Sequence, residues 1–202
     1  AYLSEMSFRF LYDEHRDVFY IGYKVDREQL DRNHYDLLAS EARIASIVAI
    51  SKGDVPQRHW LHLNRPLASV DGLLGLLSWG GSMFEYLMPD LLMRNYQDTL
   101  LDQADLAAVR RQIAYAGEKE VPWGISESGY YRFDEQMNYQ YRGFGVPGLG
   151  RKRALADDLV IAPYASLLAV GVLPKQVVEN VARLEREGML GHYGFYEALD
   201  YT

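Results

Sequence analysis

The sequence predicts a mostly α-helical fold, and three observations lead to that class. Helical periodicity or helix start and stop signals recur along most of the chain, no strand–helix alternation indicates a parallel sheet, and no fixed period indicates a solenoid. With 202 residues, 49% of them hydrophobic and 24% charged, the chain has the balance of a folded domain. No Ser/Pro-rich linker or charge block divides it, so we expect a single domain over 1–202, or a fragment of one.

The first half of the chain predicts a hairpin followed by helices. Residues 7–23 alternate apolar and polar side chains around the polar sequence DEHRD, which is typical of a short β-hairpin. Residues 26–52 have helical periodicity and are followed by GDVP, whose Gly and Pro are common helix stops, so we expect the longest helix here. Ser82 and Glu85 have capping-box spacing, and Pro89 should kink or divide the helix that they open.

The second half predicts three further helices and one long loop. Residues 98–117 form a helical pattern that Gly117 closes, and the patterns at 155–171 and 174–187 predict two more helices, the second with Pro in its first turn and Gly188 after its end. Residues 121–153 are rich in Gly and aromatic side chains and have no sustained period. We expect a long ordered loop there, and loops of that length are usually functional.

Composition excludes several classes of function. The formal charge of −7 gives no positive field for nucleic acid or anionic lipid, and the absence of cysteine excludes disulfides, a thiolate nucleophile and Cys-containing zinc sites. The longest apolar stretches are broken before the roughly 18 residues that a membrane span needs, so we expect no membrane insertion, and the first residues lack a secretory signal pattern. An excess of Tyr, 16 against 7 Phe, suits a wet cleft.

Glu41 stands out within the predicted helix at 26–52. On a helical wheel it lies in the middle of an apolar stripe that includes Leu37, whereas Asp36 and Arg43 lie about 140° to 160° away. A carboxylate on a buried helix face must be paired, hydrogen-bonded or turned to a water-lined cavity. Two roles remain open, a structural ion pair with an arginine, or a catalytic acid, base or nucleophile.

Glu127 lies in the sequence PWGISESGY at 122–130, among aromatic and hydroxyl side chains. Aromatic faces stack on sugar rings while hydroxyls meet the sugar hydroxyls, so this segment indicates the edge of a sugar cleft; a surface Glu in a turn is the alternative. Two carboxylates in an aromatic cleft are what glycosidic-bond chemistry requires. The sequence cannot give their separation, so retention and inversion of configuration both remain open.

Other candidates are weaker. Residues 143–148 match G-x-G-x-x-G without a surrounding βαβ unit, the basic residues 151–153 lie beside two aspartates and indicate a solvated ion-pair cluster, and His59 and His62 lack further metal ligands nearby. We therefore expect no cofactor and no metal. For three more carboxylates we favour a structural role over a functional one: Glu85, Glu197 and Asp200.

Seven motifs in a fixed order resemble the glucoamylase-like region of cyclic β-1,2-glucan synthases, and the similarity runs from about Phe8 to the last residue. They are YDLLASEAR at 35–43, GDVP at 53–56, MFEYLMP at 83–89, PWGISES at 122–128, NYQY at 138–141, GVPGLG at 145–150 and YGFYEALD at 193–200. The resemblance implies a portion of an (α/α)6 toroid, with a short N-terminal hairpin and long aromatic loops, related to endo-β-1,2-glucanase glycoside hydrolases.

The resemblance also implies a reaction, retaining transglycosylation that closes linear β-1,2-glucan into a ring. It places the nucleophile at Glu41 and the acid/base at Glu127, although the division of roles between them is open. The residues expected to line sugar subsites are Trp79, Trp123, Tyr139, Tyr141 and Arg142. A β-1,2-glucan hydrolase and a non-catalytic glucan-binding or assembly module are the alternatives.

The number of predicted helices is about half of what a twelve-helix toroid needs. We therefore expect a soluble portion of a large membrane-bound synthase, on the cytoplasmic side of a bacterial inner membrane, with the rest of that synthase as its partner. Uncovered apolar helix faces predict that the isolated fragment either self-associates or repacks locally.

Overall fold

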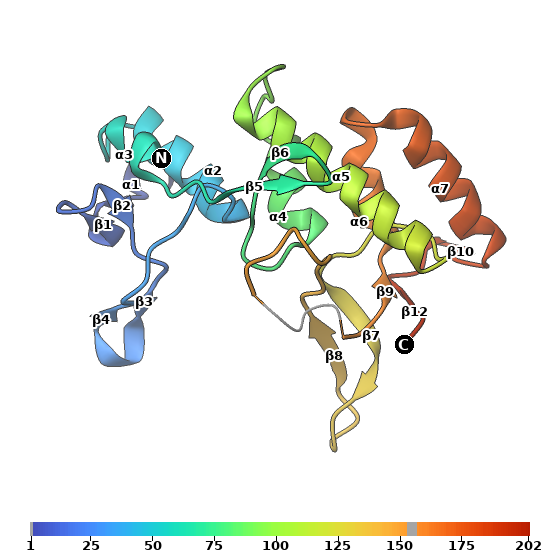
Figure 1. Cartoon of the computed structure of the whole chain (residues 1–202). Helices are drawn as coiled ribbons and strands as arrows, with labels where there is room; N and C mark the ends of the chain where they lie inside the picture. The colour runs from blue at the N-terminus through green and yellow to red at the C-terminus, as the bar shows by residue number, and fades with distance from the viewer. Residues whose placement is uncertain (1, 153–156) are drawn as a thin grey trace. The chain divides into compact units, whose positions relative to one another are not determined.

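The computed structural model describes residues 2–152 and 157–202 (Figure 1). The chain divides into two compact units, Ala1–Arg65 and Pro66–Thr202. No Ser/Pro-rich linker marks this division in the sequence. Within the described residues, no helix combines the length and the apolar character needed to cross a bilayer.

The first unit is built from short elements around one helix of three turns. Its elements are α1 (Tyr2–Glu5), η1 (Arg9–Leu11), β1 (Tyr12–Asp13), β2 (Val18–Phe19), β3 (Tyr23–Lys24), η2 (Val25–Arg27), β4 (Gln29–Leu30), α2 (Ser40–Ser51) and α3 (Arg58–His62). Strands β1 and β2 pair antiparallel, which confirms the predicted hairpin within residues 7–23. Its core centres on Phe19, Ala49 and Val55.

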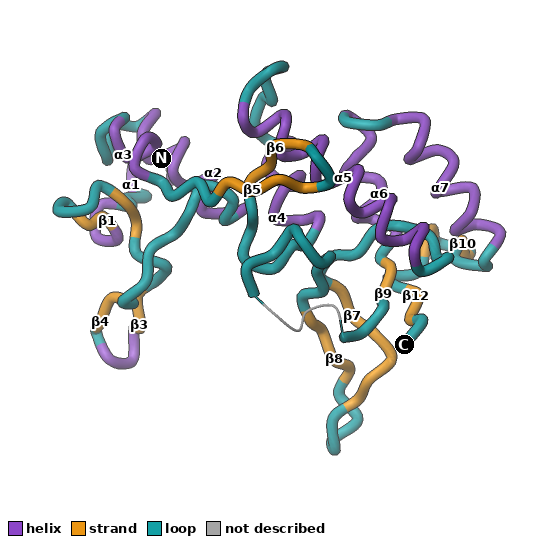
Figure 2. Tube along the Cα trace, in the orientation of Figure 1, coloured by secondary structure: helices purple, strands orange, loops and turns teal. Residues whose placement is uncertain are grey.

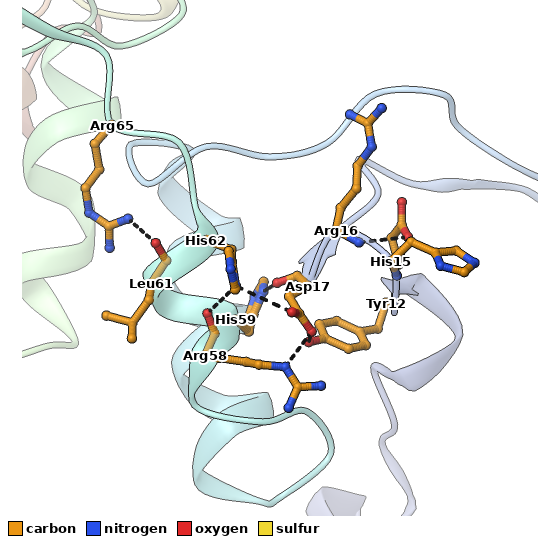
Figure 3. Close-up of polar contacts among 10 residues, drawn as sticks. Tyr12, His15, Arg16, Asp17, Arg58, His59, Leu61, His62 and Arg65 are labelled. Carbon is orange, nitrogen blue, oxygen red and sulfur yellow. Dashed lines mark hydrogen bonds and ion pairs between the residues drawn. The ribbon is translucent and has the colours of Figure 1, made fainter.

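Asp17 ties the β1–β2 hairpin to α3. Its backbone is left-handed, with φ of 57°, and its carboxylate accepts hydrogen bonds from the Tyr12 hydroxyl at 2.6 Å and from Arg58 Nε at 2.8 Å (Figure 3). The buried ring of His59 lies 2.9 Å from the Asp17 carbonyl oxygen through Nδ1 and 2.8 Å from Ser46 Oγ through Nε2. These contacts join the hairpin, α3 and α2, so the cluster has a structural role.

The prediction of one helix over 26–52 is wrong in its first half, since α2 begins at Ser40. Glu28 has a left-handed backbone, with φ of 49°. The carboxylates of Asp31 and Asp36 each accept a hydrogen bond from the amide two residues further on, at 2.9 Å and 3.0 Å. Such local bonds compete with the helix for backbone amides, which is why the periodic sequence does not form one.

The second unit contains a helical layer and several small sheets. Its elements are β5 (Leu67–Val70), β6 (Leu73–Leu76), α4 (Met83–Leu87), η3 (Met88–Leu91), α5 (Leu100–Glu118), β7 (Ser128–Phe133), β8 (Tyr139–Arg142), β9 (Val160–Ile161), α6 (Pro163–Leu168), η4 (Ala169–Gly171), α7 (Pro174–Arg186), β10 (Leu190–Gly191), β11 (Gly194–Phe195) and β12 (Leu199–Asp200). Figure 2 shows the β7–β8 hairpin extending away from the helices of this unit.

Helix α5 forms the centre of the second unit. Its small residues Ala104, Ala107 and Ala108 are buried, and this lets the β5–β6 hairpin approach so closely that a Cβ on Gly75 would lie 3.3 Å from Ala107. Tyr86 of α4 is also fully buried, and burial raises the pKa of its hydroxyl well above the usual range. At this contact between helix and sheet, small side chains in close packing fill the interior in place of large apolar side chains.

Several predicted helix boundaries of this unit are confirmed. The capping box of Ser82 and Glu85 opens α4, which becomes a 3-10 helix around Pro89, and α5 spans Leu100–Glu118. Helix α7 has Pro at its first position and ends just before Gly188, whose φ is 80°. Local capping signals are therefore reliable in this sequence.

Two other predictions need correction. The predicted loop at 121–153 contains the β7–β8 hairpin, because strand pairing satisfies the amides of its aromatic residues. The predicted helix at 155–171 falls partly on residues 153–156, outside the described residues; beyond them the chain forms β9, α6 and η4. The described residues form six two-stranded antiparallel sheets beside the helices, so the fold is mixed rather than mostly α, and the toroid stays a prediction.

Candidate functional site

Residues 122–128, here called the Glu127 segment, run through the second unit with their backbone held by helix side chains. The side-chain amide of Gln112, on α5, accepts from the Ile125 N–H at 2.8 Å and donates to its carbonyl oxygen at 2.7 Å. Asn180, on α7, does the same for Trp123 at 3.0 Å and 2.7 Å. Two paired amide contacts therefore fix the segment just before Glu127.

Helix α6 holds the same segment from a third side. Gly124 has φ of 132°, and a Cβ there would lie 2.7 Å from Ser166 Oγ, so only Gly fits against α6. The Tyr164 hydroxyl lies 2.8 Å from both Ser126 Oγ and the Glu127 carbonyl oxygen. Burial, ahead of the nearby carboxylate charges, raises the pKa of Tyr164 well above its usual range, so it stays a neutral hydrogen-bonding group.

The Glu127 side chain is half-buried and meets the tyrosines of the β7–β8 hairpin. The Tyr141 hydroxyl donates to Glu127 Oε2 at 3.3 Å. Burial first, and then the charge of Glu127, raises the pKa of Tyr141 to about 12. Tyr141 pairs with Gly129 across the hairpin, and Tyr139 lies over Gly129 where a Cβ would otherwise be. These four residues form one surface, here called the Glu127 face.

The C-terminal segment supplies two carboxylates to the edge of β7. Glu197 accepts from the Gly129 N–H at 2.8 Å and from the Tyr139 hydroxyl, and Asp200 accepts from the Tyr131 N–H at 3.2 Å. Strand β12, which carries Asp200, pairs with β9. The tail therefore covers backbone amides that the hairpin leaves unpaired on its outer edge.

The residues predicted to line subsites fall into two groups. Trp79, Tyr139 and Tyr141 are 60%, 51% and 60% exposed, and the guanidinium of Arg151 lies over the Trp79 ring, 5.6 Å from its centroid. Trp123 is only 6% exposed, so its ring packs inside the protein. Arg142 forms an ion pair with Asp158, a residue that is itself buried.

Glu41 lies in the first unit, at the start of α2, and the helical wheel misplaced it. The buried face of α2 is formed by Ala42, Ser46 and Ala49, and Arg43 is 1% exposed, whereas Glu41 is exposed. The wheel failed because it averaged α2 with residues before Ser40 that are not helical.

Glu41 is nevertheless held in place. The Ser40 hydroxyl donates to Glu41 Oε2 at 2.6 Å, and a helix N-terminus favours a negative charge. Burial of Tyr35, followed by the charge of Glu41, raises the pKa of that tyrosine. Glu41 thus combines an exposed carboxylate with a fixed position.

The remaining candidates have structural explanations. In the sequence at 143–148, Gly145 serves close packing, since a Cβ there would overlap the carbonyl oxygen of Gly80, and Gly148 has a left-handed backbone with φ of 91°. Asp158, expected to pair with the basic residues 151–153, is paired with Arg142 and Arg132. Among the described residues, no group of three or more His, Asp or Glu side chains could hold a metal ion.

Sequence inspection missed the residues that position Glu127, namely Gln112, Tyr164 and Asn180. Gln112 and Asn180 lie on helices and are almost fully buried, at 0% and 5% exposure. A long amide side chain within the apolar face of a helix must find a hydrogen-bond partner, and that was the available signal. Which backbone it would bond could be seen only in the fold.

Three comparisons with known proteins agree. The family model described as Glycoamylase matches residues 33–202. The cyclic beta-(1,2)-glucan synthase NdvB of Rhizobium meliloti (strain 1021) is 48% identical over 197 residues, which is 98% of this chain and 7% of that protein. The chain thus spans a small part of this curated relative.

Solved structures with the same fold include two proteins at low sequence identity. The endo-beta-1,2-glucanase of Chitinophaga pinensis matches with a TM-score of 0.69 at 17% identity, covering 99% of this chain and 51% of that one. A protein from Bacteroides caccae ATCC 43185 described as a glucoamylase matches with a TM-score of 0.68 at 16% identity, covering 99% and 52%. The resemblance expected from the ordered motifs is confirmed.

Proposed function

Because the chain belongs to the Glycoamylase family, we propose that it is a carbohydrate-active portion of a cyclic β-1,2-glucan synthase. In this proposal it takes part in the retaining transglycosylation that converts linear β-1,2-glucan into a ring. Its 48% identity to NdvB supports the glucan class, since that protein is named as a synthase of cyclic β-1,2-glucan. The proposal concerns the longer protein, of which this chain spans a part.

One observation carries the assignment of chemistry to Glu127. Its segment is fixed by paired amide contacts from Gln112 and Asn180, and its half-buried carboxylate meets the Tyr141 hydroxyl on a face with exposed aromatic rings. Rigid support of one carboxylate beside stacking surfaces is the arrangement that a glycosidase uses to place its acid or nucleophile against a sugar. A surface Glu in a turn would need no such support.

The proposed reaction has two steps. In the first, the Glu41 carboxylate attacks the anomeric carbon while Glu127 gives its proton to the glycosidic oxygen, so the C–O bond of the linkage breaks as an enzyme ester forms. In the second, a sugar hydroxyl from the other end of the bound glucan attacks the same carbon, Glu127 takes its proton, and Glu41 leaves. One linkage is broken and one is made, so no water is consumed.

The exposed rings Trp79, Tyr139 and Tyr141 would bind glucose units by stacking, and Arg142 would donate to sugar hydroxyls. Trp123, expected at a subsite, takes a different part in this proposal because it is buried. Its buried ring would anchor the Glu127 segment, to which it belongs, in the interior of the protein.

Replacing Glu127 by Gln in the longer protein tests the proposal. The variant keeps the shape of the side chain but loses its proton transfer, so we expect turnover of linear β-1,2-glucan to fall by at least about 10²-fold with binding preserved. The matched control is Glu135→Gln, an exposed glutamate in the turn between β7 and β8. Full turnover by the Glu127 variant would defeat the assignment.

An activated substrate separates the two roles. An aryl β-glucoside with a good leaving group needs no protonation, so its first step survives loss of the acid but not loss of the nucleophile. We expect Glu127→Gln to release the aryl group and Glu41→Gln to release none. The opposite pattern would exchange the two roles.

Product analysis separates the alternatives. Hydrolysis adds one reducing end for every linkage broken, whereas ring closure leaves the number of reducing ends unchanged. For a non-catalytic module, a double variant of Glu41 and Glu127 would bind linear glucan and leave product formation by the longer protein unaltered. Calorimetry on that variant, together with product analysis, decides between enzyme and module.

A further inference from the structure

Glu197 and its two partners form a unit on the Glu127 face that the proposed reaction does not use. The carboxylate comes from the C-terminal segment and spans two hydrogen-bond donors of the hairpin, the Gly129 N–H through Oε1 at 2.8 Å and the Tyr139 hydroxyl through Oε2. Both oxygens are therefore engaged. We refer to Gly129, Tyr139 and Glu197 together as the Glu197 clamp.

The clamp depends on a glycine at 129. A Cβ there would overlap the hydroxyl and ring atoms of Tyr139, so the tyrosine lies flat over the strand only because the side chain beneath it is missing. Tyr139 is otherwise an exposed side chain, at 51% of its surface, and would be free to take several rotamers. A charged acceptor on its hydroxyl selects one of them.

The Glu197 clamp lies beside Tyr141, the residue whose hydroxyl donates to Glu127. Tyr141 is two residues from Tyr139, so both side chains point to the same side of β8, and Tyr141 is paired with Gly129 across the hairpin. The charge of Glu197 contributes, after burial and Glu127, to the raised pKa of Tyr141. Moving Tyr139 or the Gly129 amide would therefore disturb the ring next to Glu127.

We propose that Glu197 is a positioning residue for sugar binding, which fixes the Tyr139 ring and the Gly129 strand so that Tyr139 and Tyr141 meet two sugar units at a set spacing. The identity of the ligand, linear β-1,2-glucan, rests on the proposed function. Glu197 transfers no proton in this role. Ordering the tyrosine before binding removes an entropic cost that the ligand would otherwise have to offset.

Three variants of the 202-residue chain test the clamp by calorimetry with linear β-1,2-glucan. Glu197→Gln removes the charged acceptor, Tyr139→Phe removes the donor but keeps the ring, and Gly129→Ala displaces the ring while leaving the carboxylate intact. We expect each to weaken binding by about tenfold, the effect of one charge-assisted hydrogen bond. The control Glu135→Gln should bind as the unaltered chain does.

The combination of variants distinguishes positioning from separate contacts. If Glu197 acts through Tyr139, the double variant Glu197→Gln with Tyr139→Phe is no weaker than either single variant, whereas independent contacts would multiply to about a hundredfold loss. Normal affinity in Glu197→Gln, or a multiplied loss in the double variant, would overturn the proposal. Urea unfolding of the same variants checks that the loss is not a loss of fold.

A titration decides the structural half of the proposal without any ligand. The hydrogen bond to Glu197, ahead of burial, raises the pKa of Tyr139. Glu197→Gln should therefore lower the pH at which Tyr139 ionises, measured as the difference in phenolate absorbance from the Tyr139→Phe chain. An unchanged titration refutes the clamp. A different result would contradict only the ligand. If Glu197→Gln shifts the titration of Tyr139 but the unaltered chain does not bind linear β-1,2-glucan, the clamp stands and the proposed function is contradicted.

Discussion

Replacing Gln112 by Leu should lower the free energy of unfolding of the second unit, and the size of the loss follows from the hydrogen bonds that the Gln112 side chain makes. Gln112 is fully buried, and its amide bonds both the N–H and the carbonyl oxygen of Ile125, at 2.8 Å and 2.7 Å. Leucine fits a helix and fills much of the same space, but it leaves both backbone groups buried without a partner. Each orphaned group costs about 1–3 kcal/mol, so the free energy of unfolding should fall by about 2–6 kcal/mol.

The measurement is urea unfolding of the chain, followed with hydrogen exchange at the Ile125 amide. The loss is large beside the roughly 5–15 kcal/mol that stabilises a typical domain, so it should be unmistakable. Gln103→Leu is the matched control, because Gln103 lies on the same helix but is exposed, and we expect it to change stability by less than about 0.5 kcal/mol. Equal effects of the two variants would refute the argument that the amide holds the Glu127 segment.

Two further predictions concern packing and pH. Gly145→Ala should destabilise the second unit by more than about 3 kcal/mol, because its Cβ would overlap the backbone carbonyl of Gly80, while Gly143→Ala, with open space around it, should be tolerated in the same unfolding assay. Burial lowers the pKa of His59, so the folded chain binds its proton less tightly than the unfolded chain does. This contribution to stability is complete above about pH 6.5 and is lost as the pH falls toward the folded pKa. Replacing His59 by Gln should therefore flatten the decline in stability on acidification, measured by urea unfolding at a series of pH values.

Local sequence signals predicted those elements whose stability is itself local. The capping box of Ser82 and Glu85, the Pro and Gly that bound α7, and the β1–β2 hairpin were all confirmed. Such features depend on contacts between residues a few positions apart, which a single chain displays directly. The ordered motifs also identified the family, because seven matches in one order are far more specific than any one.

The wheel argument at Glu41 failed for the opposite reason. Periodicity continues from 26 to 52, but Asp31 and Asp36 divert backbone amides into local turns, and the helix starts only at Ser40. Its buried face then turns away from Glu41 and takes in Arg43. Hydrophobic periodicity alone does not show whether a backbone amide bonds to a nearby side chain or to the carbonyl oxygen of a helix.

By itself, the sequence determined the family, most helix ends in the second unit, and Glu127 as a candidate for chemistry. Only the tertiary structure decided how Glu127 is supported, because Gln112, Asn180 and Glu197 reach their partners across 13, 57 and 68 positions of the chain. A hydrogen bond between residues so far apart in the chain produces no local periodicity or spacing from which it could be predicted. It forms because helices that bury their apolar faces bring an amide or carboxylate to an otherwise unsatisfied backbone group.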